Sequence, residues 1–305
     1  MKCFKSLVAR LKAALLVILR TDERMDEVKI NQGRILSAMN AHKTSKNIQD
    51  YEFKIFSQWG EDGIIQHLTR VVEIKHKTFI EFGVEDFSES NCRYLLMKDN
   101  WRGFVIDGSA KNIERLKRSY FYWKYDLNAV DAFITKDNIN ALLLKSGFDE
   151  DLGILSIDID GNDYYVLEAI DTFKPRILIC EYNAVLDGTK KKISVPYDPD
   201  FFRTRKHHSN LYFGASLAAM THIAQQKGYV LAGTNMSGGN AFYVRKDVWN
   251  DRLEALTAEQ AFTDSRFRES RDEEGNLTFA GGEDRLKLIR GMPVFNVAEN
   301  APETL

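Results

Sequence analysis

The chain has 305 residues, of which 44% are hydrophobic and 28% are charged, so it can bury a sizeable core. Its formal net charge of -2 gives no whole-molecule attraction to nucleic acid, and we expect no nucleic-acid partner. The three cysteines are widely spaced and form no CxxC pair. This spacing argues against a disulfide framework or a zinc site and fits a reducing compartment.

The first twenty residues superficially resemble a signal peptide. Their uninterrupted apolar run, residues 13–19, is too short to span a membrane, and no cleavage site of small residues follows it. We therefore expect a cytoplasmic protein.

A seven-residue repeat runs through residues 4–42 and predicts an N-terminal helical segment over 1–45. Two positions in each repeat would lie on one face of a helix, and together they form the seam. The first position holds Phe4, Leu11, Ile18, Met25, Gln32 and Met39, and the second holds Leu7, Ala14, Thr21, Val28, Ile35 and His42. Three interpretations stay open: a helix packed on its own domain, a coiled coil that makes a homo-oligomer, or peripheral membrane contact. The last arises because the first twenty residues hold five basic and no acidic side chains.

Short apolar segments alternate with helical patterns through residues 46–250. Strands are predicted over 77–82, 103–107, 120–126, 153–160 and 176–182, with helices over 90–98, 109–118, 131–145 and 163–171. A helix over 214–227 leads into a hairpin of residues 229–245. The pattern predicts an α/β, Rossmann-like domain whose mostly parallel sheet has an antiparallel last strand. Residues 251–305 are charged and weakly periodic, and we expect a C-terminal extension there.

Acidic residues end the predicted strands, where open parallel sheets bind their ligands. Glu81 ends the first strand, and Gly83 behind it permits close approach of a ligand to the backbone. Asp107 ends the second strand, where an acid can bond both ribose hydroxyls. Asp126 ends the third predicted strand and would accept from an adenine amino group, unless it is merely an exposed acid.

The loop after the first strand separates two cofactor classes. It reads Gly-Val-Glu-Asp-Phe-Ser instead of G-x-G-x-x-G, and its two carboxylates would repel the pyrophosphate of NAD. S-adenosylmethionine has no phosphate and carries a sulfonium cation, so an acidic loop suits it. The sequence therefore favours S-adenosylmethionine as the cofactor.

Five stretches together resemble FkbM-like S-adenosylmethionine-dependent methyltransferases over residues 53–247. They are FSQWGEDGIIQHL, FIEFGVEDFSESNCRYLL, WRGFVIDGS, ILSIDIDGNDYYVLEAI and RILICEYN. The resemblance implies a seven-stranded class I methyltransferase sheet and O-methylation of a sugar hydroxyl on a bacterial surface glycan or glycosylated metabolite. The residues it implies for cofactor binding are Gln58, Glu81, Gly83, Asp107, Gly108, Ser109, Asp126 and Asp158. Glu85 departs from the pattern, since many relatives have a second loop glycine there.

Two alternatives to this function remain. One is a methyltransferase that acts on a protein, a lipid or a small molecule, and the other is a non-catalytic scaffold with the same fold. An empty cofactor pocket would favour the scaffold.

Candidates for the chemistry follow the fourth and fifth predicted strands. Asp160 is the first candidate for the proton acceptor, and His207, beside a basic stretch over 190–206, is the second. The alternative to a catalytic role is that His207 and His208 are a solvated pair in a surface loop. Asp160, Glu181 and Asn183 offer oxygen ligands on adjacent strand ends and would suit Mg²⁺. Without a metal, Asp158 would contact the cofactor and Asp160 the substrate.

Overall fold

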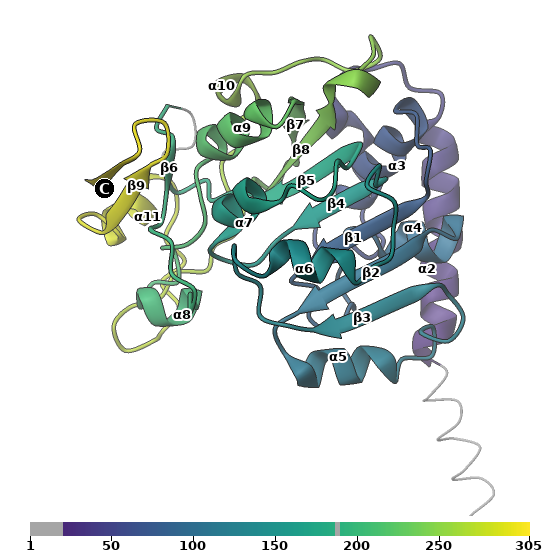
Figure 1. Cartoon of the computed structure of the whole chain (residues 1–305), viewed down its shortest axis with the longest axis horizontal. Coiled ribbons are helices and arrows are strands. Elements are labelled where there is room, and N and C mark those ends of the chain that lie inside the picture. The colour runs from purple at the N-terminus through teal and green to yellow at the C-terminus, as the bar shows by residue number, and fades with distance from the viewer. Residues whose placement is uncertain (1–20, 187–189) are drawn as a thin grey trace, which may run out of the picture.

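The computed structural model describes residues 21–186 and 190–305, and the seam positions before Thr21 lie outside these ranges. Within them, the chain forms a seven-stranded sheet with helices on both faces and a separate three-stranded sheet (Figure 1). None of the described helices is both long and apolar enough to cross a membrane.

The large sheet confirms the predicted fold class. Its strands are β1 (Thr78–Phe82), β2 (Arg102–Asp107), β3 (Leu127–Asp131), β4 (Ile154–Ile157), β5 (Ile177–Glu181), β7 (Tyr229–Thr234) and β8 (Asn240–Arg245). Their order is β3-β2-β1-β4-β5-β8-β7, and among these strands only β8 runs against the others. The strand order reverses between β1 and β4, so the carboxyl ends of these two strands border the expected ligand site.

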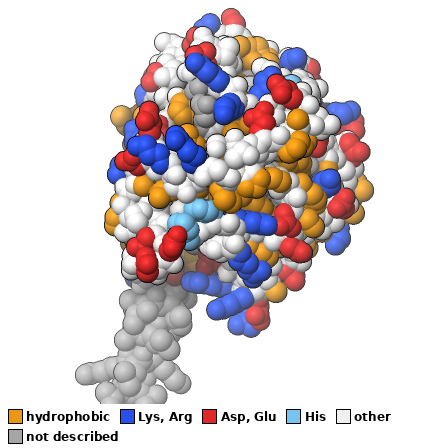
Figure 2. Space-filling model, turned by 90° about the vertical axis from the view of Figure 1, so that its left-hand side faces the viewer, with side chains coloured by type: hydrophobic (Ala, Val, Ile, Leu, Met, Phe, Trp, Pro, Cys, Tyr) orange, Lys and Arg blue, Asp and Glu red, His pale blue; other side chains and the backbone are white. Residues whose placement is uncertain are grey.

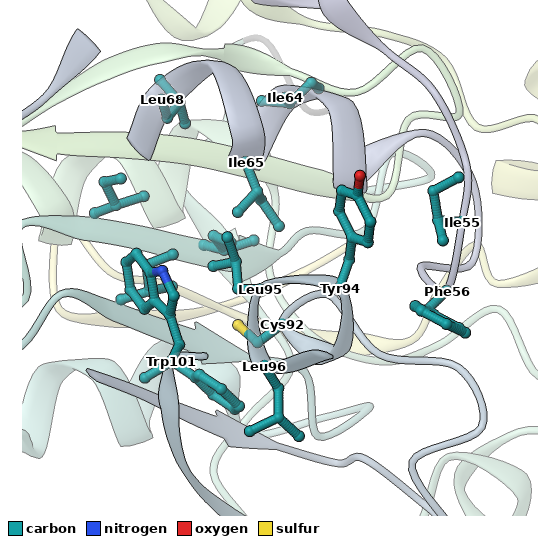
Figure 3. Close-up of a cluster of buried hydrophobic side chains, with 14 of the residues drawn as sticks. Ile55, Phe56, Ile64, Ile65, Leu68, Cys92, Tyr94, Leu95, Leu96 and Trp101 are labelled. Carbon is teal, nitrogen blue, oxygen red and sulfur yellow. The ribbon is translucent and has the colours of Figure 1, made fainter. Parts of the chain in front are cut away.

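Helices bury both faces of this sheet. One face carries α3 (Glu61–Val71), α4 (Arg93–Asp99) and α5 (Ala110–Lys117), and the other carries α6 (Ile139–Leu144), α7 (Asp163–Ala169) and α9 (Leu217–Gln226). Each layer of helices forms a hydrophobic core with the face of the sheet that it covers. Figure 3 shows Ile65 of α3 above Leu95 of α4 in the core on the first of these faces. Phe79 and Ile80 belong to different cores, because successive strand residues point to opposite faces.

A long helix, α2 (Thr21–Asn40), lies along the edge of the molecule (Figure 1). Asp26 anchors it, since its carboxylate accepts hydrogen bonds from Arg93 at 2.5 Å and from the Tyr120 hydroxyl at 2.6 Å. Gly33 lies against the Tyr94 ring, where an added Cβ would come within 2.4 Å of the hydroxyl oxygen. A short 3-10 helix, η1 (Ile48–Tyr51), then leads the chain to α3.

The C-terminal segment folds onto the carboxyl edge of the large sheet. The second sheet has the order β10-β9-β6 and joins β6 (Ile193–Ser194) to β9 (Pro293–Asn296) and β10 (Ala301–Thr304). Near it lie α8 (Arg203–Lys206) and α11 (Glu283–Leu288), whereas α10 (Ala258–Ala261) packs on β7 and α9, and the 3-10 helix η2 (Lys246–Val248) directly follows β8. Val195, Phe213 and Val294 share a third core. Residues 251–305 thus have an internal structure that their weak periodicity did not predict.

The predicted third strand is wrong. Residues 120–126 form turns and irregular structure, and the strand β3 begins only after them, at Leu127. Tyr120 and Phe121 pack edge to face within these turns, and the Tyr120 hydroxyl bonds Asp26 of α2. The helix expected over 131–145 is correspondingly short and covers only Ile139–Leu144.

Candidate functional site

A cavity of about 740 Å³ opens at the carboxyl ends of β1, β2, β4 and β5. Its walls come from the loops after these strands, from α8 and its neighbours, and from the C-terminal segment. Figure 2 shows the side of the molecule that carries the small sheet, where hydrophobic side chains form a band between charged ones. The cavity therefore lies where the strand order predicts a ligand.

The loop after β1 has a positive φ at three residues, Gly83, Glu85 and Phe87, and the first two border the cavity. Gly83 has φ 66°, and a Cβ there would lie 1.7 Å from the backbone oxygen of Asp158. The glycine is thus required by the close approach of two protein loops, a reason that the sequence did not reveal. Glu85 has φ 47°, so it adopts the left-handed backbone that a glycine would adopt more easily. This conformation explains why a glycine suits that position in the FkbM-like pattern.

Asp107 ends β2, lines the cavity and is 8% exposed. One carboxylate oxygen accepts the backbone N–H of Glu85 at 2.8 Å and the other accepts that of Ser109 at 2.8 Å. Each oxygen keeps a further lone pair, so the carboxylate can still bond two ribose hydroxyls. Ser109 does not line the cavity, because its hydroxyl caps α5 by accepting the N–H of Asn112. Gln58 and Gly108, which the resemblance implies for cofactor binding, both line the cavity.

Glu81 touches the same cavity but its carboxylate holds the chain. It accepts hydrogen bonds from the Ser90 hydroxyl at 2.6 Å and from the backbone N–H groups of Asn91 at 2.7 Å and Cys92 at 3.2 Å. Burial raises the pKa of Glu81 to about 7, against the opposing effect of these donors. Its main visible role is to fix the loop that leads into α4.

The adenine contact predicted for Asp126 is wrong. Asp126 precedes β3 and therefore lies at the amino edge of the sheet, away from the cavity. Its side chain is 64% exposed and accepts from Arg102 at 2.6 Å. The chain after β3 supplies Phe133 and Ile134 to the cavity instead.

Three carboxyl groups gather after β4 and β5. Ligand atoms of Asp158, Asp163 and Glu181 all lie within 4.8 Å of one another. Asp163 is occupied by the chain, since it accepts the N–H groups of Ile159 and Gly161, both at 2.9 Å. No described residue donates a backbone N–H to Asp158 or Glu181, and Glu181 Oε2 is buried with no hydrogen-bond partner.

Asp158 and Glu181 are therefore the members of this group whose carboxyl groups are not committed to a loop. Burial is the main cause that raises the pKa of both groups well above the ordinary range, and the neighbouring carboxylates raise it further. Both residues line the cavity. Such a pair can share one proton at neutral pH or hold a cation.

The predicted metal set needs correction at two positions. Asp160, with φ 54°, forms an ion pair with Arg203 at 2.9 Å and does not join the group around Glu181. The Asn183 amide donates to the backbone oxygens of Leu211 and Phe213, both at 2.9 Å, and its oxygen accepts the N–H of Val185. Asn183 is thus committed to its own loop, and the acids whose ligand atoms lie near those of Glu181 are Asp158 and Asp163.

His207 does not reach the cavity. Its Nδ1 lies 2.8 Å from the Ser209 hydroxyl, and its ring packs against His208 with centroids 4.2 Å apart. Burial and His208 lower its pKa. This geometry matches the alternative in which the two histidines belong to a surface loop.

Several lining residues were missed because they reach the cavity through long-range packing. They are Phe133, Phe201, Phe213, Phe267 and Arg285. Arg285 is 3% exposed and donates to the backbone oxygens of Ala280 and Phe267. No described carboxylate forms an ion pair with it. Nothing local in the sequence distinguishes these residues from ordinary core or surface residues.

Comparisons with known proteins give structural likeness alone. No family model matches the chain, and no curated protein matches it. Solved structures that resemble it include the N-terminal domain of EvdMO1 with SAH bound (9% identity, 62% of this chain and 80% of that chain, TM-score 0.39). A putative caffeoyl-CoA O-methyltransferase from Staphylococcus aureus is 16% identical over 61% of this chain and 82% of that chain, with TM-score 0.39. A S-adenosylmethionine-dependent methyltransferase from Clostridium acetobutylicum is 6% identical over 61% of this chain and 90% of that chain, with TM-score 0.38. Likenesses this low carry no argument about function, which must come from the site.

Proposed function

We propose that the chain is an S-adenosylmethionine-dependent O-methyltransferase that acts on a sugar hydroxyl. The observation that carries the proposal is the buried Asp107 carboxylate at the end of β2, beside the point where strand order reverses. An acid at this place in a Rossmann-like sheet bonds the ribose of a nucleoside cofactor. The fold and the FkbM-like sequence pattern agree with this choice.

The charge of the cavity favours a cationic cofactor over a dinucleotide. The acidic lining residues are Glu81, Glu85, Glu89, Asp107, Asp158, Asp160, Glu181 and Glu269, whereas the basic ones are Arg203 and Arg285. A pyrophosphate placed among so many carboxylates would be repelled. The sulfonium and ammonium groups of S-adenosylmethionine would be attracted, and its adenine would lie on the apolar side near Phe133.

The Asp158–Glu181 pair supplies the proton acceptor in this proposal. Bound S-adenosylmethionine provides an electrophilic methyl carbon. As the acceptor oxygen bonds to that carbon, the carbon–sulfur bond breaks, its electron pair stays on sulfur, and the hydroxyl proton passes to the unprotonated carboxylate of the pair. A carboxylate with a raised pKa is a stronger base, so burial of the pair favours this transfer.

A sugar acceptor fits the rest of the lining. Phe201, Phe213 and Phe267 provide aromatic faces against which a sugar ring can pack, and polar side chains lie between them. Arg203 bridges Asp160 and Glu269, with ion pairs of 2.9 and 3.8 Å. In this role Asp160 positions Arg203 at the rim of the cavity.

Mg²⁺ is the alternative occupant of the carboxyl pair. Asp158 and Glu181 supply hard oxygen ligands, and the buried Oε2 of Glu181 has no other partner. A cation there would orient the acceptor hydroxyl and promote its deprotonation. Chelation separates the two roles, since only the metal-dependent enzyme would lose activity in EDTA and regain it with Mg²⁺.

Calorimetry with S-adenosylmethionine, S-adenosylhomocysteine and NAD tests the cofactor. We expect binding of the first two in the micromolar range and none of NAD. Single-turnover methyl transfer to a sugar acceptor, with Glu181→Gln and Asp160→Asn compared, then tests the chemistry. Glu181→Gln should slow transfer about 10²–10⁴-fold, whereas Asp160→Asn should act mainly on acceptor affinity. A protein that binds none of the three ligands would be a scaffold.

A further inference from the structure

The seven-residue repeat and the packing of α2 use opposite faces of the same helix. The face that meets the domain carries Asp26, Ile30, Gly33 and Asn40, all of which are buried. At 100° per residue, the centre of this face lies about 140° from the centre of the repeat's seam. Packing on the domain therefore leaves the seam free.

The seam is exposed over the whole described length of α2. Met25 is 52% exposed, Val28 61%, Ile35 63% and Met39 63%. Single exposed apolar side chains are ordinary, but four in line on one helix face mark an interaction surface. Gln32, also exposed, interrupts the line in the way that a polar seam residue fixes register in coiled coils.

We propose that this face binds the same face of a second copy of the chain as a coiled coil. The apolar spacing continues in the sequence before Thr21, where Leu7, Leu11 and Ile18 hold seam positions. A repeat sustained over residues 4–42 is the sequence pattern of a coiled coil. A seam that recurs at the same spacing is also complementary to itself, as a symmetric dimer requires.

Two other occupants fit the observations less well. The described helix α2 offers an anionic membrane little attraction, because it has four acidic residues, Asp22, Glu23, Asp26 and Glu27, against the three basic residues Arg24, Lys29 and Arg34. Residues 4–20 could cover the seam only after a reversal of the chain. Helical hairpins often turn at glycine, and residues 1–32 contain neither glycine nor proline.

Light scattering on the full chain tests the proposal, with two variants of matched charge. The seam variant carries both Val28→Glu and Ile35→Glu, which lower the net charge by two units. The control variant, Arg34→Glu, lowers the net charge by the same amount at an exposed position off the seam. The wild type and Arg34→Glu should have the mass of two chains at about 10 µM. The seam variant should have the mass of one chain, with a dissociation constant raised about 100-fold or more.

Far-ultraviolet circular dichroism should show all three proteins folded, because the substituted side chains are exposed. If the acidic pair nevertheless unfolds the chain, Met25→Lys with Met39→Lys should dissociate the dimer in its place. A wild type with the mass of one chain at about 100 µM would overturn the proposal, as would a dimer that survives both seam variants. A monomeric wild type that sediments with phosphatidylserine vesicles would assign the face to a membrane.

Discussion

Replacing Asp107 by alanine should weaken S-adenosylmethionine binding about tenfold to a hundredfold. Hydrogen bonds to a charged group such as a carboxylate are worth about 1.5–3 kcal/mol each when both partners are desolvated by the protein. The cavity is open to solvent, so we expect a net loss of about 1.4–3 kcal/mol in calorimetry. The backbone N–H groups of Glu85 and Ser109 also lose their acceptor. The free energy of unfolding should therefore fall by about 2 kcal/mol in the same variant.

Two acids at the ends of the neighbouring strand β3 provide control substitutions, which show whether a loss of cofactor affinity comes from a lost contact or only from a lost negative charge. Asp131 ends β3 directly opposite Asp107 but is exposed and does not line the cavity. Asp126 lies at the other end of β3. Asp131→Ala and Asp126→Ala should leave the affinity unchanged. Unchanged affinity in a folded Asp107→Ala, or an equal loss in Asp126→Ala, would refute the assignment of the ribose site.

Three further predictions concern the loops around the cavity. Gly83→Ala should lower the free energy of unfolding by about 3 kcal/mol or more in urea denaturation, because its Cβ would collide with the backbone oxygen of Asp158; a stable variant would contradict the observed approach of the two loops. Glu85→Gly should raise the free energy of unfolding by about 1 kcal/mol by relieving a positive φ, a gain that a lower melting temperature would disprove. The pKa of Glu81 is raised to about 7 from an ordinary value of 4.5, so the folded chain holds this proton longer than the unfolded chain. Its contribution to stability, about 3 kcal/mol at most, should be present below pH 4.5 and be lost as the pH rises through 7; urea midpoints that rise over this range would contradict it.

Local patterns in the sequence were sufficient for most of the sheet. Ile154–Ile157 and Ile177–Glu181 are apolar runs of strand length, and burial on both faces makes such runs easy to recognise. The acids behind these strands were predicted to meet at one edge, and the structure brings Asp158 and Glu181 together there. Strand ends converge because the strands are parallel, so their positions follow once the strands are known.

Long-range contacts decided the features that local patterns missed. The aromatic run 120–126 has high strand propensity, yet Tyr120 bonds Asp26 of α2 and stays outside the sheet. Leu127–Asp131 has a weaker strand pattern but pairs with β2 along its whole length. Phe267 and Arg285 enter the cavity from a segment without clear periodicity. In each case the partner lies far away in the sequence, where single-residue propensities carry no information.

Some acids at the carboxyl edge hold the loops of the chain, and others are available to a ligand in the cavity. Residue type alone does not tell these two groups apart. Glu81 and Asp163 have their oxygens filled by N–H and O–H donors of their own loops, so they build the site without being available to a ligand. Asp107 does both, since it holds two loops and still faces the cavity. Asp158 and Glu181 hold no loop by a backbone bond, and their burial is unfavourable until a proton or a cation neutralises them. A fold that keeps such a pair in a cavity, where neither carboxylate accepts a backbone N–H from a described residue, supports the proposal that the pair takes part in the chemistry.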